Sequence, residues 1–267
     1  MIGRLLRFDV FAKSFLIQAA WNADRMQNVG FLFSIRRVLK NVWKDHPEKF
    51  EAAVGRASSF FNTHPYFAPA VMGVAIHLEE KIARGEAAPE DLDSARTRLS
   101  APLNALGSLW FWDHLKLLAF LMALPLLILR DPRAILAGAV LFFAVFNFFH
   151  IRTRWIGLRL GLEYGESMVP HLLQFFPSRM LSAFRRISAF LLGTTAPLVL
   201  AILFERLQNR LPNLLEMFYI PEMFFPRLIL GLVSMTVAAA VMHYRWLSVY
   251  QLIAITIGLA VGVARWG

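Results

Sequence analysis

The stretch FFNTHPYFAPAVMGVAIHLEE, residues 60–80, decides how this chain folds. Its apolar middle, Tyr66 to Ile76, is too short to span a bilayer, which takes about 20 apolar residues in a helix. Asn62, Thr63 and Pro65 suit the start of a helix, because Asn and Thr cap free amides and Pro fits the first turn. One interpretation is a helix that enters the membrane part way and packs against a partner or the chain's own spans, with Gly73 at a close contact. The alternative is an amphipathic helix on the membrane surface.

The composition favours a multi-span membrane protein. Of the 267 residues, 57% are hydrophobic, and the mean hydropathy is +0.52, which is more than one soluble core needs. Cysteine is absent, which excludes disulfide frameworks and thiolate chemistry. The net charge of +10 comes from Lys and Arg at the ends of apolar runs. That pattern is typical of membrane topology, so no nucleic acid is expected as a partner.

Residues 1–106 are mixed in polarity and predict an N-terminal region of short amphipathic or re-entrant helices, largely on the cytoplasmic side. Basic residues are spaced among apolar ones, as in helices that lie on an anionic membrane surface. An ordinary cytosolic helical domain is the alternative. The start, MIGRLLRFDVFAKS, reaches Asp9 and Lys13 before any long apolar core, unlike a secretory signal. The basic residues of this region include Arg4, Arg7, Lys13, Arg25, Arg36, Arg37, Lys40 and Lys44.

Residues 107–267 predict a transmembrane helical domain, so the expected fold is all-α and polytopic. Arginines are concentrated between the second and third apolar runs, whereas acidic residues offset them in residues 205–227. This bias predicts a multi-pass protein with a cytoplasmic N-terminus and a cytoplasmic 150–186 loop. The five predicted spans are Leu109–Leu129, Ala134–Phe149, Ile187–Phe204, Leu228–Met242 and Trp246–Ala264.

No reactive centre is expected. The run His77-Leu78-Glu79-Glu80 lacks the second histidine of a HExxH zinc helix, and the seven His have no ligand spacing. Glycine-rich phosphate loops and nucleophile elbows are also missing from the sequence. The prediction is therefore a protein that is not an enzyme, with no catalytic residue, metal or cofactor.

Polar groups beside or within apolar runs are the remaining candidates. Asp113 follows Trp112 at the start of the first span, where it either faces a cavity or lies at the interface beside an aromatic belt. Asn147 in the second span suits a hydrogen bond to a neighbouring helix, which is commoner than substrate contact. Residues 18–27 combine stacking and hydrogen-bonding groups that suit a sugar or a helix junction, namely Gln18, Trp21, Asn22, Arg25 and Gln27.

Four blocks of sequence, in order, resemble the IID subunit of the mannose/fructose/sorbose type of bacterial phosphotransferase (PTS) sugar permeases. The first block is SFLIQAAWNADRMQNVGFLFSI, Ser14–Ile35, and the second is the opening stretch, residues 60–80. The third is APLNALGSLWFWDHLK, Ala101–Lys116. The fourth is LFFAVFNFFHIRTRWIGLRLGLEYG, Leu141–Gly165.

The resemblance implies a non-catalytic subunit of the bacterial cytoplasmic membrane. It implies pairing with a IIC subunit, in a hetero-oligomer of several copies, to move a hexose-type sugar that separate IIA and IIB domains phosphorylate. The lipid bilayer and the sugar are its other partners. Joined to the residues above, the matched blocks give substrate-binding or subunit-contact candidates at Gln18, Trp21, Asn22, Arg25, Gln27, Asn62, Thr63, Pro65, Glu79, Glu80, Trp112, Asp113, Asn147 and Arg154.

The chain departs from the family pattern mainly in the third block. Ala101, Ala105 and Asp113 stand where the family has Gly, and Ser108 replaces an Asp. In the fourth block His150 replaces an Arg. Glycines allow close helix approach, and carboxylates inside a membrane are typical of functional sites. The alternative function is therefore a divergent IID relative with a scaffold or regulatory role and no sugar transport.

Overall fold

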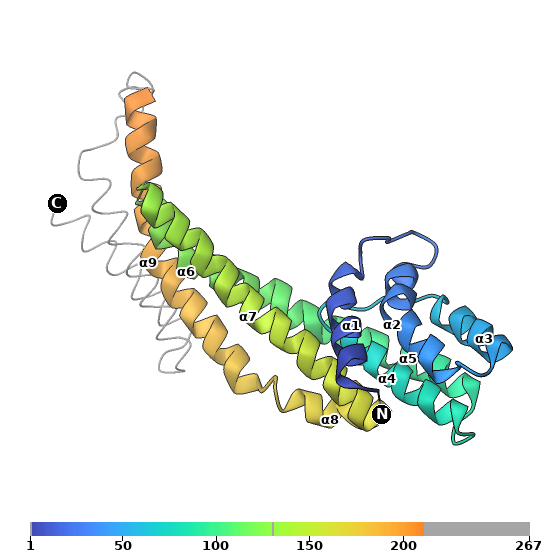
Figure 1. The fold of residues 1–267 in the computed structure, drawn as a ribbon. Helices are drawn as coiled ribbons and strands as arrows, with labels where there is room; N and C mark the ends of the chain where they lie inside the picture. Colours follow the sequence, from blue (N-terminus) through green and yellow to red (C-terminus); the bar gives the residue numbers. More distant parts are fainter. Residues whose placement is uncertain (1, 130, 211–267) are drawn as a thin grey trace. The chain divides into compact units, whose positions relative to one another are not determined.

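The computed structural model describes residues 2–129 and 131–210 (Figure 1), and every regular element in that part of the chain is a helix. The all-α prediction is confirmed. The fourth and fifth predicted spans, Leu228–Met242 and Trp246–Ala264, lie outside the described residues. The α-helices are α1 (Arg4–Lys13), α2 (Asn28–Val42), α3 (Pro47–Ala57), α4 (Ala68–Ala83), α5 (Pro89–Gly107), α6 (Lys116–Ile128), α7 (Pro132–Tyr164), α8 (Met168–Leu173) and α9 (Ser178–Arg210). Three further elements are the 3₁₀ helices η1 (Ser14–Leu16) and η3 (Gly165–Ser167) and the π-helix η2 (Ser108–Leu115).

The chain divides into two compact units. The first comprises Met1–Lys116 and Ala144–Leu181, and the second comprises Leu117–Phe143 and Ser182–Gly267. Helix α7 contributes to both units. A continuous helix from Pro89 to Ile128 runs through position 107, so the domain boundary between residues 106 and 107 stays a prediction.

Helix α4 forms the core of the first unit. Eleven of its 16 residues are buried, from Ala68 to Glu79, and it packs against α2 and α5. The helix starts later than expected: Asn62, Thr63 and Pro65 precede it, Phe67 is its N-cap, and Pro69 lies in the first turn, where its missing N–H costs nothing. A surface helix would bury one stripe only. The surface-helix interpretation of this stretch does not fit this burial, whereas packing against the chain's own helices does. Entry of this helix into the membrane stays a prediction.

Helix α4 crosses α7 at backbone contact. A Cβ atom added to Gly73 would lie 2.5 Å from the Leu158 carbonyl oxygen and 2.8 Å from the Leu162 nitrogen. On the facing side, a Cβ on Gly161 would lie 2.3 Å from the Ala70 carbonyl oxygen. Neither position has room for any side chain, so Gly73 marks the close contact that the sequence predicts. Small residues four apart let helices approach in this way.

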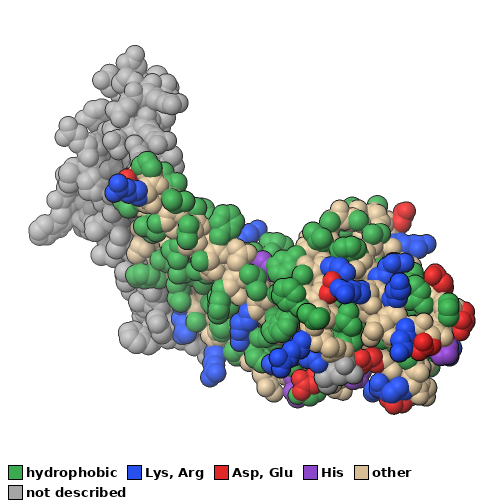
Figure 2. Space-filling model, viewed as in Figure 1, with side chains coloured by type: hydrophobic (Ala, Val, Ile, Leu, Met, Phe, Trp, Pro, Cys, Tyr) green, Lys and Arg blue, Asp and Glu red, His purple; other side chains and the backbone are tan. Residues whose placement is uncertain are grey.

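Two helical stretches of the described chain are long and apolar enough to cross a membrane, Pro89–Ile128 and Pro132–Leu173. They contain the first predicted span up to Ile128 and the whole of the second, and α9 contains the third. Helix α7 runs well past the predicted end at Phe149, because the polar residues that follow are buried within the first unit: Thr153 and Arg154 are 2% and 3% exposed. Figure 2 shows hydrophobic side chains gathered over the long helices and charged ones over the N-terminal helices.

Candidate functional site

Segments from all four blocks quoted above meet inside the first unit, in what we call the basic–aromatic cluster. Helices η1 and α7, the loop before α4 and the π-helix η2 supply its side chains. A π-helix is rare and often marks a functional site. Its members are Phe15, His64, Tyr66, Phe111, Trp112, Phe146, His150 and Arg154.

Arg154 is the charged centre of the cluster. Its guanidinium donates hydrogen bonds to the carbonyl oxygen of Ser14 at 2.7 Å and to the Ser14 hydroxyl at 3.2 Å. It also lies over the rings of Phe15 and Tyr66, 4.7 and 5.2 Å from their centroids. Among the described residues it has no acidic partner, and its Nε has no hydrogen-bond acceptor. A buried charge is costly unless it is paired, and the two cation–π contacts offset only part of that cost.

Two histidines flank Tyr66. The ring of Tyr66 stacks on His150 with centroids 4.7 Å apart, and His64 stacks on Phe111 at 5.5 Å. Within the described chain, His64 Nε2 and both ring nitrogens of His150 are buried without a hydrogen-bond partner. Burial, followed by the positive charge of Arg154, lowers the pKa of His64 to about 4, so this imidazole is neutral at pH 7. The cluster therefore offers polar groups that the surrounding described residues do not use.

Gly107 lets the π-helix approach the loop. A Cβ atom at this position would lie 2.2 Å from the His64 ring, so a side chain there would displace the imidazole. Trp112, which η2 presents to Tyr66 and His64, is 42% exposed. Asp113, next to it, is exposed. The altered third block therefore borders the cluster through Trp112, and Asp113 points outward from the folded unit.

The predicted residues before α2 and α4 form a helix junction. The Gln27 side-chain amide donates to the Thr63 carbonyl oxygen at 2.9 Å and accepts from the Thr63 N–H at 3.3 Å. It thus makes the same two hydrogen bonds that a residue on a neighbouring β-strand would make to Thr63. Asn22 donates to the side chain of Asn28 at 2.9 Å. Gln27 and Thr63 are 2% and 1% exposed. The geometry is that of the helix-junction alternative, and substrate contact by these residues stays a prediction.

Several other predicted residues are not among the side chains that define the cluster. Gln18, Trp21, Arg25 and Asn62 are exposed. Glu79 is buried, and Pro65, Glu80 and Asn147 are half-buried. Of the predicted site residues, the structure brings Trp112 and Arg154 into the cluster.

Glu79 has a clear structural role. Its carboxylate, 1% exposed, accepts two hydrogen bonds from Arg56 at 2.9 and 3.0 Å and one from the Trp43 indole at 2.9 Å. Three helices, α2, α3 and α4, are joined at this point. Bidentate Arg–carboxylate geometry is among the strongest hydrogen-bonded pairings in proteins.

Six members of the cluster were missed from the sequence, among them all of its polar members except Arg154 and Trp112. His64 and Tyr66 lie inside the opening stretch, and His150 stands out in the fourth block only as a departure from the family pattern. The other three are Phe15, Phe111 and Phe146. Arg96 was also missed: it is 4% exposed and its guanidinium binds the carbonyl oxygens of Arg56, Ser59 and Phe60. Nothing in its polar neighbourhood signals burial. In the described chain no three His, Cys, Asp or Glu side chains gather as a metal site would need.

Comparison with known proteins places the chain in a family. The family model described as the PTS system mannose/fructose/sorbose family IID component matches residues 4–267. The mannose-specific EIID component of Escherichia coli K12 is 28% identical over 185 residues, which cover 69% of this chain and 64% of that protein. The sorbose-specific EIID component of Lacticaseibacillus casei is 29% identical over 167 residues, covering 61% of this chain and 56% of that one.

A solved structure shares the fold. One chain of the cryo-EM structure of the mannose transporter ManYZ in complex with microcin E492 superimposes with a TM-score of 0.58 and 26% identity, covering 73% of this chain and 70% of that chain. Similarity extends from residue 4 through the cluster to the C-terminus. This chain therefore belongs to the IID component family of the mannose/fructose/sorbose phosphotransferase systems.

Proposed function

We propose that this membrane component pairs with a IIC-type subunit, and that together they move a hexose-type sugar into the cell while separate IIA and IIB domains phosphorylate it. The family membership supports this proposal. So does the lack of a reactive centre in the sequence, because the chemistry then belongs to other chains. In this reading the subunit is non-catalytic, is assembled in several copies with its partner, and lies in the bacterial inner membrane.

The observation that carries the proposal is Arg154, at the point where the four family-like blocks meet. A buried guanidinium without an acidic partner among the described residues, beside neutral His64 and the ring of Tyr66, offers donors and stacking faces in an apolar setting. Such groups bind sugar hydroxyls or a carboxylate presented by a partner. We infer that the cluster lines or braces the sugar pathway.

Sugar uptake in cells that co-express the IIC, IIB and IIA proteins tests this role. Arg154→Gln removes the charge, and a hydrogen bond to a charged group contributes about 1.5–3 kcal/mol. Uptake of radiolabelled mannose should therefore fall about tenfold or more. Arg152→Gln, two residues away on the same helix, is the matched control and should leave uptake near the wild-type value. Normal uptake by Arg154→Gln would contradict the assigned role.

The same cells distinguish sugar transport from the alternative of a scaffold or regulatory role. The departures of the third block from the family pattern favour that alternative. Co-purification of the wild-type chain with the IIC-type partner, without uptake of mannose, fructose or sorbose, would support that alternative. Failure to co-purify at all would contradict both proposals.

The orientation follows from the distribution of arginines. We propose a cytoplasmic N-terminus, a cytoplasmic 150–186 segment, which is helical over most of its length and not the predicted loop, and an external 205–227 segment. Single cysteines at Arg159 and Asn209 are the probes, since the chain has no other cysteine. An impermeant thiol reagent added outside the cell should label the Asn209→Cys variant alone. Labelling of Arg159→Cys alone would invert the topology.

A further inference from the structure

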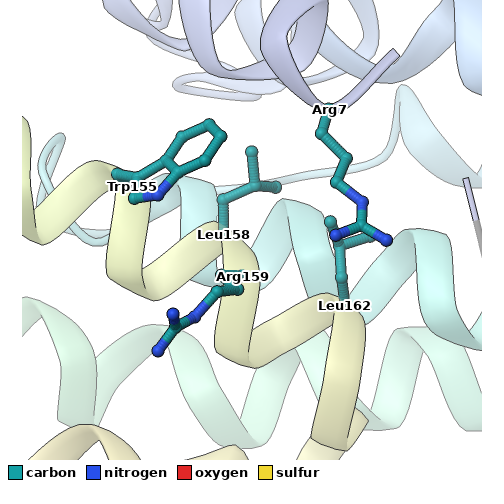
Figure 3. Close-up of a pocket in the computed structure, with 5 residues that line it drawn as sticks. All are labelled: Arg7, Trp155, Leu158, Arg159 and Leu162. Atoms are coloured by element: carbon teal, nitrogen blue, oxygen red, sulfur yellow. The ribbon is translucent and has the colours of Figure 1, made fainter. Parts of the chain in front are cut away.

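Helices α1 and α7 enclose a cavity that takes no part in the proposed sugar pathway (Figure 3). Its volume is about 40 Å³, and it opens to the surface. A single water needs roughly 10–15 Å³, so the cavity has room for a group larger than one water. Arg7 from α1 lines it together with Trp155, Leu158, Arg159 and Leu162 from α7.

Two arginines line the cavity, and no acidic side chain of the described residues forms an ion pair with either; the Arg7 guanidinium faces the cavity, while that of Arg159 extends away from it (Figure 3). Arg7 is half-buried and donates through Nε to the Ile2 carbonyl oxygen at 3.1 Å, which leaves its terminal nitrogens available. Arg159 is exposed and forms no ion pair within the described chain, although Glu163 lies one turn further along α7. The local charge therefore favours an anionic ligand.

The floor and rim of the cavity are apolar. Leu158 and Leu162 are 1% and 7% exposed and form the floor, while Trp155 is 42% exposed at the rim. On the neighbouring helix, Leu5 and Phe8 are 87% and 62% exposed. Exposed apolar side chains on a basic amphipathic helix are typical of a segment that lies in the lipid interface. A free inorganic ion would make no use of these apolar surfaces.

We propose that this cavity binds the headgroup of an anionic glycerophospholipid. The lipid phosphate binds the Arg7 guanidinium, since arginine matches phosphate oxygens with paired donors. Trp155 lies at the headgroup level, where tryptophan is enriched, and the acyl chains run along the exposed apolar residues of α1. In Figure 3 Arg159 extends away from Arg7; being exposed, it reaches the headgroup from the opposite side after a change of rotamer.

Lipid binding to the full chain purified in detergent tests the proposal. Native mass spectrometry counts bound dioleoyl phosphatidylglycerol against dioleoyl phosphatidylcholine, which has the same chains and phosphate but no net charge. The wild type should prefer phosphatidylglycerol. Each of Arg7→Gln and Arg159→Gln should weaken that binding about fivefold, the usual effect of one basic residue near an anionic surface.

Arg4→Gln is the matched control, because Arg4 is an exposed arginine on the same helix and does not line the cavity. It should bind phosphatidylglycerol as the wild type does. Equal loss from Arg4→Gln and Arg7→Gln, or no preference between the two lipids, would overturn the proposal. Displacement of the lipid by inorganic phosphate would also overturn it, since that result identifies a free-anion site. Arg159→Gln, at an exposed position, keeps the test valid if Arg7→Gln impairs folding.

Discussion

Two apolar helices of this chain have opposite surroundings. Helix α4 has 16 residues and 11 of them are buried by its own unit. In the stretch Pro132–Leu173 the most apolar window has a mean hydropathy of 2.2, yet only 11% of that window is buried in the structure. Apolar character alone thus does not say what covers a helix. Protein covers α4, whereas the apolar part of α7 has the length and composition that suit a bilayer or a partner subunit.

The largest expected effect is a loss of stability when the buried carboxylate of α4, the helix that protein covers, is removed. Glu79→Ala should destabilise the first unit by about 3 kcal/mol, because it leaves Arg56 and the Trp43 indole without their buried acceptor. Thermal unfolding of the detergent-purified protein measures the loss. Glu86→Ala is the control, since its pair with Arg84 is exposed, and it should unfold as the wild type does. Equal melting of the two variants would show that the buried pair does not hold α4.

The next effect concerns α7, whose apolar part is mostly exposed in the structure. Leu136 lies in the apolar part of α7 and is 66% exposed. If lipid surrounds it, Leu136→Asp should cost about 2.5–3.5 kcal/mol of membrane insertion. The measurement is the fraction of protein that stays in carbonate-washed membranes. Ala52→Asp, at an exposed position of α3, should have no effect. An unchanged fraction for Leu136→Asp would mean that α7 is not in contact with lipid there.

A smaller loss of stability tests the close crossing of α4 and α7 at Gly73. Gly73→Ala should destabilise the protein by about 1–3 kcal/mol, because the new Cβ meets backbone atoms of α7 that cannot move aside. Gly55→Ala in α3 is the matched control, because a Cβ there meets nothing within 4 Å. It should stabilise the protein slightly, by up to about 1 kcal/mol, since Ala is the better helix former. Thermal melting in detergent compares the two, and a stabilising Gly73→Ala would rule out the close crossing.

The candidate site was predictable only in part. Arg154 and Trp112 stand in blocks with a family pattern, and Gln27 and Thr63 carry the amide and hydroxyl groups that a junction uses, so residue type identified them. The cluster itself was not predictable, because its members lie far apart in the sequence, as the contact of Arg154 with Phe15 shows. His64 and His150 are identified as members of the cluster only by their stacking on Phe111 and Tyr66 in the folded structure.

The sequence by itself determined the all-helical class, the family and the half-length of the apolar segment at residues 66–76. These follow from local quantities: hydropathy, the positions of Pro and Gly, and ordered motifs. Only the tertiary structure decided that α4 is interior rather than on a surface, that Gly73 and Gly161 bring two backbones together, and that Glu79 is a buried structural charge. The physical reason is that burial depends on which distant segment covers a residue, and hydropathy is the same whether lipid or protein provides the cover.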